Sequence, residues 1–432
     1  MITFAGRDGQ GRTVYDGDYN NVSPRVGFAW QPFGDSTTVI RSGYGLFYGP
    51  PLPGSNNMAA GFSIDGDFLT PDNGVTAPFL LRDGFPPVAR PELGAGFGAV
   101  PIDEAPVFSP EFIDHDRNIG YSQMWNFSIQ RGLGFNAIVE ASYLGNVGHK
   151  IPGPDVSINQ LRPEDFGPGN RQALRPFPQF NNVVAQTRMW GNSSYHGLNL
   201  KLEKRFSGGL NFLANYTWAK FIDDVPAQFE AGEADVGMQN LYDRAAEKAL
   251  SGNDVRHRLV WSSVYEIPLG KDRALLNSGP LALILGGWNF GAIVTLQQGS
   301  PITLVTQANT LNAFNPGPQR VNVLRDPALP QEERTVERYF DTEVVVAPPQ
   351  FTFGNAGRSL LTGPGIVNFD VSLLKNHRWG ERYNVQFRFE AFNFFNTAQF
   401  DEPGRALGSP QFGVISSAGD PRSLQFGLKF AF

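Results

Sequence analysis

The last nine residues of the chain alternate strictly between apolar side chains and small or polar ones. The apolar members, which share one face of an extended strand, are Leu424, Phe426, Leu428, Phe430 and Phe432. An apolar face opposite a small or polar face, closing on an aromatic residue, is typical of a strand between lipid and a wet interior. A soluble sheet can also use this pattern once, so its repetition along the chain decides between the two.

The alternation recurs along most of the 432 residues. Residues 198–206 and 210–218 form a hairpin pattern around Ser207, Gly208 and Gly209, with apolar residues at every second position. The same pattern occurs in segments 26–30, 44–48, 125–129, 135–143, 259–267, 288–296, 367–373 and 383–389. Together the segments predict about eleven strands of roughly 8–13 residues.

Connections between these segments alternate between short and long. The predicted short turns are 32–37, 131–134, 206–209, 268–286 and 376–382. The long connections are 49–119, 146–193, 222–254, 299–365 and 397–421. Tyr and Trp recur near the ends of the apolar strands, namely Tyr48, Trp125, Tyr143, Trp218, Trp288 and Tyr383. We therefore expect an all-β antiparallel transmembrane β-barrel with short periplasmic turns, long external loops and aromatic girdles.

Composition excludes several other classes. Charged residues make up 18% and aromatics 13%, and the net charge of −6 gives nucleic-acid binding no electrostatic support. The absence of Cys excludes disulfides and thiolate chemistry. The sequence has no apolar stretch long enough for a transmembrane helix, which leaves membrane-spanning strands open. No G-x-S-x-G elbow or zinc motif occurs, and Gly94–Gly98 lacks a flanking βαβ pattern, so we predict no enzyme activity, cofactor or metal site.

The direction of the strands also constrains the architecture. Counting back from Phe432, the last strand and the first clear strand, 25–31, both run from the long-loop side to the short-turn side. An odd strand count does not close an ordinary bacterial barrel. The first residues, with Met1–Phe4 as the stub of an earlier strand, carry no signal peptide. We therefore expect residues 1–432 to be one partial barrel domain, the C-terminal portion of a larger protein.

Several stretches resemble the C-terminal half of TonB-dependent outer-membrane receptors of the Oar-like type. Examples are Ser-Pro-Arg-Val-Gly-Phe-Ala-Trp at 23–30 and Glu-Ala-Phe-Asn-Phe-Phe-Asn at 390–396. Further matches lie at 41–48, 141–146, 215–220, 254–258, 287–290 and 363–365. The resemblance implies a barrel of about 22 strands in the outer membrane, of which 11–12 are expected here. It also implies energy from TonB and the proton-motive force. The plug and the carboxypeptidase-regulatory-like domain of that family are absent from this sequence, so TonB would act only through an N-terminal region.

Four groups of residues are candidate sites. The terminal apolar residues 424–432 are expected to be read by the barrel-assembly machinery, through strand addition at an exposed edge. A lumen charge ladder is predicted from Lys201, Glu203, Arg205, Asp370, Arg388 and Glu390. An acidic run in a long loop could contact a ligand or cation, although a solvated loop is the simpler interpretation: Asp223, Asp224, Glu230, Glu233 and Asp235. Arg256, His257 and Arg258 could contact lipopolysaccharide phosphates or an anionic ligand, although a salt-bridged strand end is the simpler interpretation.

Three functions remain open at this point. The leading hypothesis is active uptake of a large nutrient (a glycan, a peptide or a metal chelate) through a TonB-dependent receptor. The second is an outer-membrane adhesin or secretion-related surface protein without an uptake role. The third is a soluble all-β binding module, which would bury the apolar faces in a core. The predicted partners are outer-membrane lipid, lipopolysaccharide and the barrel-assembly machinery, with TonB acting only through the N-terminal region.

Overall fold

The computed structural model describes residues 15–34, 37–49, 79–85, 109–186, 188–225, 237–270, 275–314, 317–379 and 382–432, together with 9, 11, 13, 101 and 273. Within them, one 12-stranded sheet dominates, and four small sheets of two or three strands lie in the connections. A short helix, α1 (Pro280–Leu285), accompanies them. No helix of the described portion is long and apolar enough to cross a bilayer. The prediction of an all-β antiparallel fold is confirmed.

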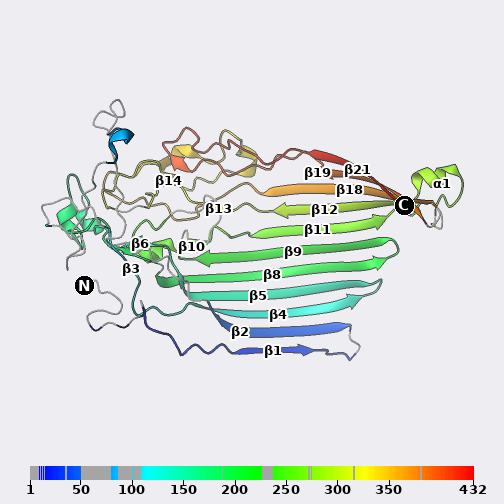
Figure 1. Cartoon of the computed structure of the whole chain (residues 1–432), viewed down its shortest axis with the longest axis horizontal. Helices are drawn as coiled ribbons and strands as arrows, with labels where there is room; N and C mark the ends of the chain where they lie inside the picture. The colour runs from blue at the N-terminus through cyan, green and yellow to red at the C-terminus, as the bar shows by residue number, and fades with distance from the viewer. Residues whose placement is uncertain are drawn as a thin grey trace.

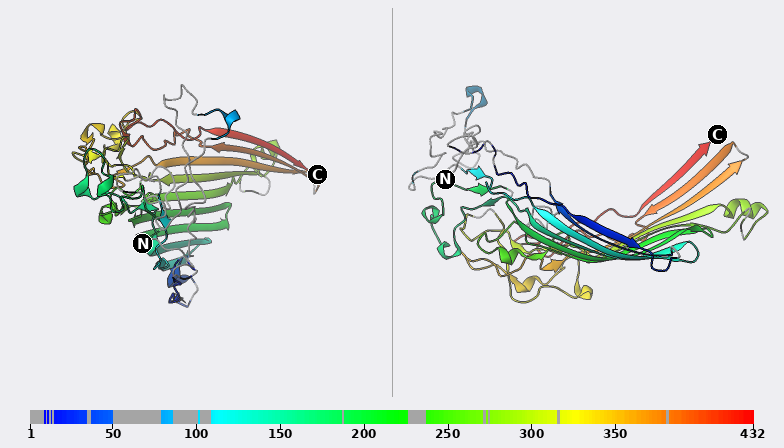
Figure 2. Two further views of the ribbon diagram at one scale, coloured as in Figure 1. Left: turned by 60° about the vertical axis from the view of Figure 1, so that its left-hand side comes forward. Right: turned by 90° about the horizontal axis from the view of Figure 1, so that it is seen from below.

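The large sheet places strands next to one another in the order in which they occur in the chain, all antiparallel (Figure 1). Its strands are β1 (Arg25–Trp30), β2 (Thr38–Tyr48), β4 (Tyr121–Leu133), β5 (Ala137–Pro152), β8 (Met189–Ser207), β9 (Leu210–Asp223), β11 (His257–Glu266), β12 (Trp288–Gln297), β18 (Ile366–Trp379), β19 (Tyr383–Phe392) and β21 (Ser423–Ala431). β10 (Ala249–Leu250) adds a short pairing to β9. The sheet is strongly curved, with β18, β19 and β21 turning away from the plane of the earlier strands (Figure 2).

The two ends of the sheet differ. The described residues of the short connections that follow β1, β4, β8, β11 and β18 lie at one end, here called the turn end, with α1 and the C-terminus (Figure 1). The described residues of the long connections gather at the opposite end, here called the loop end. The predicted alternation of short and long connections is therefore confirmed. The final strand runs toward the turn end, as the parity of the connections predicts.

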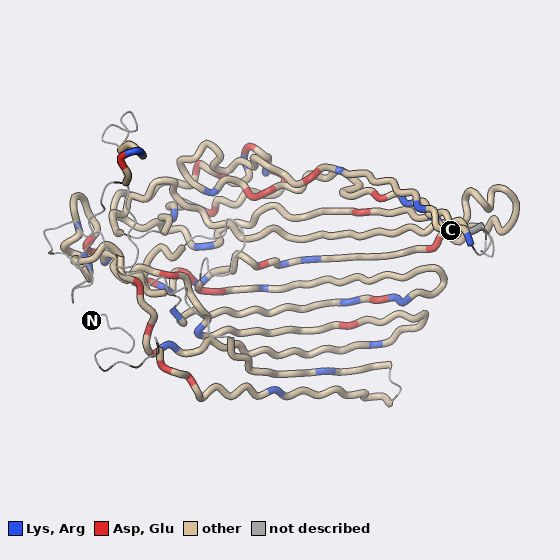
Figure 3. The backbone as a smooth tube through the Cα atoms, in the orientation of Figure 1, with Lys and Arg blue, Asp and Glu red and all other residues tan. Residues whose placement is uncertain are grey.

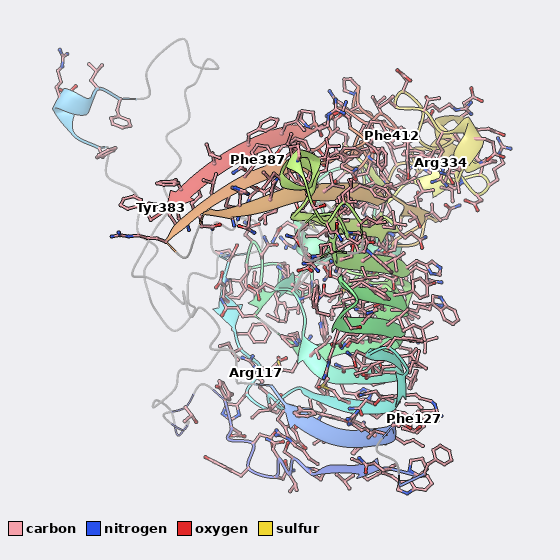
Figure 4. The ribbon with its side chains drawn as sticks, turned by 90° about the vertical axis from the view of Figure 1, so that its right-hand side faces the viewer. Arg117, Phe127, Arg334, Tyr383, Phe387 and Phe412 are labelled. Carbon is pink, nitrogen blue, oxygen red and sulfur yellow. The ribbon has the colours of Figure 1, made fainter. Side chains whose placement is uncertain are left out.

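Cross-strand register places the predicted apolar faces on one side of the sheet. Direct partners share a face, so a row can be followed from strand to strand. One such row is Trp30, Ile40, Ile129, Ala141, Leu200, Tyr216, Leu259, Leu296 and Val367. We call this side the apolar face and the opposite side the polar face. Phe127 of the apolar face lies on the convex side, away from Arg117 (Figure 4).

Some boundaries differ from the prediction. β4 continues to Leu133, and the turn is 134–136, where Phe135 and Asn136 both have positive φ. Phe135 is thus a turn residue, 90% exposed, rather than the first apolar residue of β5. β8 begins at Met189 rather than at 198, and its 19 residues exceed the predicted lengths. The apolar alternation is confined to the part of β8 from residue 198 onward, because a strand can continue beyond the bilayer, where neither face needs to be apolar.

The long connections pack into a core of their own. A buried cluster in segments 302–361 and at Ile415, here called the loop core, includes Leu304, Val321, Phe340 and Leu361. Short pairings tie the connections together: β13 (Pro301–Ile302) with β17 (Leu361–Thr362), β14 (Val305–Thr306) with β20 (Ala406–Leu407), β15 (Asn322–Val323) with β16 (Val345–Val346), and β7 (Val184–Ala185) with both β3 (Glu111–Phe112) and β6 (Val156–Ser157). Six 3₁₀ turns complete the described elements: Leu81–Asp83, Pro163–Asp165, Gln172–Leu174, Arg244–Glu247, Gln331–Glu333 and Thr342–Val344.

Candidate functional site

The apolar face is exposed across the whole sheet. On β21, Leu424, Phe426, Leu428 and Phe430 are 52%, 68%, 77% and 55% exposed. Apolar residues of β1, β4, β8 and β9 on this face are likewise exposed, among them Phe28, Phe127, Leu200 and Trp218. A soluble protein rarely exposes an apolar patch larger than a few hundred Å². An apolar surface spanning eleven strands requires a lipid environment, which argues against the soluble alternative.

Aromatic residues flank this face at both ends. All six predicted girdle residues belong to the apolar face by register: Tyr48, Trp125, Tyr143 and Trp218 toward the loop end, and Trp288 and Tyr383 at the turn end. Hydrogen bonds join Tyr143 Oη to His196 Nδ1 at 2.7 Å and Tyr216 Oη to His257 Nδ1 at 2.8 Å. Amphipathic rings with polar tips suit a membrane–water boundary, where one end is apolar and the other is wet.

Strand β21 forms one edge of the described sheet. It pairs with β19, where Phe426 lies opposite Phe389 with ring centroids 5.1 Å apart. Phe432 lies just beyond the strand, 87% exposed and stacked on Phe430 at 5.7 Å. The other edge of β21 has no partner strand among the described residues, and neither does the outer edge of β1. An open edge is what strand addition requires, and recognition by the assembly machinery remains a prediction.

The polar face carries the first part of the predicted charge ladder. On β8, Lys201 Nζ lies 2.8 Å from Glu203 Oε2, and Arg205 Nε lies 3.5 Å from Glu203 Oε1. Glu140 of β5 is the direct cross-strand partner of Lys201 and adds a second carboxylate to this group. Residues two apart on a strand share a face, so the alternation alone places these three β8 side chains together.

The other three ladder residues form a separate group on β18 and β19. Arg388 Nη1 lies 3.9 Å from Glu390 Oε1. Asp370 accepts hydrogen bonds from the Asn368 side chain at 3.0 Å and from the Asn393 backbone N–H at 2.9 Å. β9, β11 and β12 lie between the two groups, so the structure forms two clusters rather than one ladder.

Two residues of the acidic run, Asp223 and Asp224, do not lie in a solvated loop. Asp223 is the last residue of β9, is buried, and forms an ion pair with the buried Arg358. Asp224 accepts hydrogen bonds from the Asn192 backbone at 2.6 Å and side chain at 3.0 Å. Both carboxylates are thus engaged in fixing the connections to the sheet. Glu230, Glu233 and Asp235 lie outside the described residues.

The pairing of Arg358 with Asp223 places the loop core over the polar face. Ala219 and Asp223, which point to the polar face, are 5% and 6% exposed, whereas Trp218 on the apolar face is 53% exposed. A second buried pair, Arg320 with Glu247, joins two long connections. Charged residues are also frequent in the connections at the loop end, while the strands between the two ends carry few (Figure 3).

Sequence reasoning missed these buried pairs because no local pattern marks them. Arg358 and Asp223 are 135 positions apart, and Arg320 and Glu247 are 73 apart. Arg175 is a further buried arginine in a long connection, and burial lowers the pKa of its guanidinium to about 10. Such cations inside the loop region indicate an ordered assembly rather than solvated loops.

The segment Arg256–Arg258 forms a strand start with local partners. Arg256 Nε lies 3.8 Å from Asp254 Oδ2, and His257 bonds to Tyr216. These local contacts favour the interpretation of this segment as a salt-bridged strand end over a contact with an anionic group outside the protein. Within the described ranges, no three His, Asp or Glu side chains are grouped so as to hold a metal ion.

A family model described as an outer membrane beta barrel domain matches residues 1–425. No curated protein matches the chain in sequence. Similar solved structures include the outer membrane transporter YddB from Escherichia coli, with a TM-score of 0.48, 10% identity, and coverage of 95% of this chain and 40% of that one.

Two further structures are similar at greater distance. The FrpB iron transporter from Neisseria meningitidis has a TM-score of 0.42 and 12% identity, covering 95% of this chain and 38% of that one. The ferric preacinetobactin receptor BauA from Acinetobacter baumannii has a TM-score of 0.41 and 9% identity, covering 95% and 36%. The chain thus spans about two fifths of the length of these structures. With the family model covering nearly all of the sequence, the chain belongs to the outer membrane β-barrel domain family and is a protein of the outer membrane.

Proposed function

We propose that the chain forms part of the wall and the external cap of a TonB-dependent receptor, which takes up a large nutrient across the outer membrane. The observation that carries the proposal is the arrangement of the sheet and its connections. One face is apolar along its whole width, the other holds ion pairs, and the long connections pack over the polar face at the loop end. A receptor needs a lipid-facing wall, a wet interior and an ordered external surface.

The open edges support a larger barrel. A membrane-spanning sheet needs both edges paired, because lipid offers no hydrogen bonds to a free strand edge. Strands β1 and β21 end the sheet without such partners among the described residues. Additional strands would widen the barrel toward the size of outer-membrane transporters with about 22 strands. The Oar-like sequence stretches support the same family, with TonB engaging an N-terminal region. The proposal includes no catalytic step.

The test uses the full-length gene product in its own cells. Uptake of labelled ferric chelate, oligosaccharide and peptide is compared in wild-type, gene-deleted and ionophore-treated cells, and the receptor is cross-linked to TonB in vivo. We expect gene-dependent uptake that the ionophore abolishes, together with a TonB cross-link. Absence of the cross-link with normal surface display, accompanied by loss of cell attachment in the deletion strain, would favour the adhesin alternative.

A further inference from the structure

A polar cavity at the loop end has not been assigned a role. It has a volume of about 190 Å³ and lies between segment 114–118, which leads into β4, and segment 188–190, at the start of β8. On the same measure, one water needs only roughly 10–15 Å³. The cavity therefore has room for a small organic group.

One wall of the cavity is Arg117, a cation that has no counter-ion within the described part of the chain. Arg117 is 9% exposed, and its Nη1 is buried with no hydrogen-bond partner. Among the residues that the structure describes, its Nη2 hydrogen-bonds only to the Met189 sulfur, at 3.5 Å, and its guanidinium lies 5.5 Å from the centre of the Tyr15 ring. No carboxylate of the described residues pairs with it. A buried charge without a partner is strongly unfavourable, so this side chain favours an anion beside it.

The other arginines around the cavity are already neutralised. Arg188 Nε bonds to Asp114 Oδ2 at 2.8 Å. Arg244, just outside the lining, lies 3.6 Å from Asp224 and donates to the Trp190 carbonyl at 2.7 Å. The site therefore holds one unneutralised buried guanidinium rather than a general basic patch.

Trp190 forms a fixed aromatic wall. The guanidinium groups of Arg188 and Arg244 lie 5.0 and 4.5 Å from the centre of its ring. The indole Nε1 is buried without a hydrogen-bond partner among the described residues. A Cβ atom on residue 153 would lie only 2.0 Å from this nitrogen, which is too close for any residue other than glycine. Glycine at 153 is therefore required for the indole to occupy this place. The wall is set by packing before any ligand arrives, which lowers the cost of binding.

We propose that this cavity binds the carboxylate group of an external solute, with Arg117 as its counter-ion and Trp190 as its aromatic wall. The planar guanidinium fork matches a carboxylate in shape and charge. Asp116 also lines the cavity, and its carboxylate repels a dianion more strongly than a monoanion. The Arg188–Asp114 pair adds no net positive charge to offset this repulsion. A monoanionic group therefore fits better than doubly charged phosphate. The loop end is the external side of an outer-membrane barrel, where solutes arrive. Binding here requires no transport, so the inference stands independently of the proposed uptake.

The experiment uses the full-length protein purified in detergent. Acetate and benzoate are titrated while saturation-transfer NMR reports binding, and inorganic phosphate is titrated separately by ³¹P line broadening. We expect saturable binding of both carboxylates, weaker binding of phosphate, and at least tenfold weaker carboxylate binding in Arg117→Met. The matched control is Arg162→Met, which removes an arginine at the loop end whose side chain is 64% exposed and should leave binding unchanged.

Folding of each variant is checked by heat-modifiable migration on gels. If Arg117→Met does not fold, Arg117→Lys keeps the charge but loses the fork, and we expect carboxylate binding to weaken severalfold. Unchanged carboxylate affinity in the folded Arg117 variant, or no saturable carboxylate binding to the wild-type protein, would overturn the site. Tighter binding of phosphate than of either carboxylate would overturn the ligand class.

Discussion

Replacing Leu200 by arginine tests the division of the sheet into two faces. Leu200 lies on the apolar face of β8, opposite Ala141 and Tyr216, and is 41% exposed. It is four residues from His196, whose Nδ1 hydrogen-bonds the polar tip of the girdle residue Tyr143 and so marks the membrane–water boundary at the loop end. At about 3.3 Å per residue and a tilt of about 40°, that separation is about 10 Å of membrane depth. Half of an apolar band about 25 Å tall is about 12 Å, so Leu200 lies near the bilayer midplane.

An arginine at that depth on the lipid face costs about 2–4 kcal/mol. We expect Leu200→Arg to lower the free energy of unfolding of the full-length protein by this amount, measured by urea titration in phosphatidylcholine vesicles. The matched control is the adjacent Asn199→Arg on the polar face. It removes one hydrogen bond to Thr217 (3.1 Å), worth about 0.5–1.5 kcal/mol. A loss for Asn199→Arg equal to or greater than that for Leu200→Arg would show that the faces are assigned the wrong way round.

Three other predictions concern the loop end and the terminus. Arg320→Met leaves Glu247 buried without its ion-pair partner and should lower the local stability of the loop core by about 3–5 kcal/mol. Adding Glu247→Met should recover most of that stability. Hydrogen exchange of the loop amides measures the stability of both variants, and an equal loss in the single and the double variant would contradict the pairing. Burial raises the pKa of Asp254, so its folded form binds a proton more readily than the unfolded chain and local stability should rise as pH falls from neutral through that raised pKa. Asp254→Asn should abolish this rise, and exchange profiles with the same pH dependence in both proteins would refute it. Deleting Phe432 should reduce membrane insertion of the full-length protein, and unchanged surface levels and gel migration would count against its role as an assembly signal.

The two faces of the sheet could be predicted from sequence because a strand has a side-chain period of two. Once a segment is extended, Leu200 and Lys201 must lie on opposite faces, whichever strands become its neighbours. The same argument holds for Leu428 and Lys429 in the last strand. The order of short and long connections was also predictable, since alternation breaks wherever the chain leaves the sheet.

Positions of turns were less predictable because they depend on backbone conformations that several residues can adopt. Gly132 and Gly134 favoured a turn at 131–134, but the residues with positive φ are Phe135 and Asn136. A register shift between Lys204 and Ser207 likewise interrupts the alternation where the β8–β9 hairpin closes. There Lys204 Nζ bonds to backbone and side-chain oxygens of Ser207 at 2.8 and 2.6 Å.

The sequence by itself determined that this chain builds a wall with a lipid side and a wet side, because that property is local and repeats every second residue. Only the tertiary structure decided how the loop end is assembled. The Arg358–Asp223 pair joins residues 135 positions apart, and the carboxylate cavity joins Arg117 to Trp190 across a connection and two strands. Such contacts carry no periodic signal, since they depend on where the folded chain brings distant segments together.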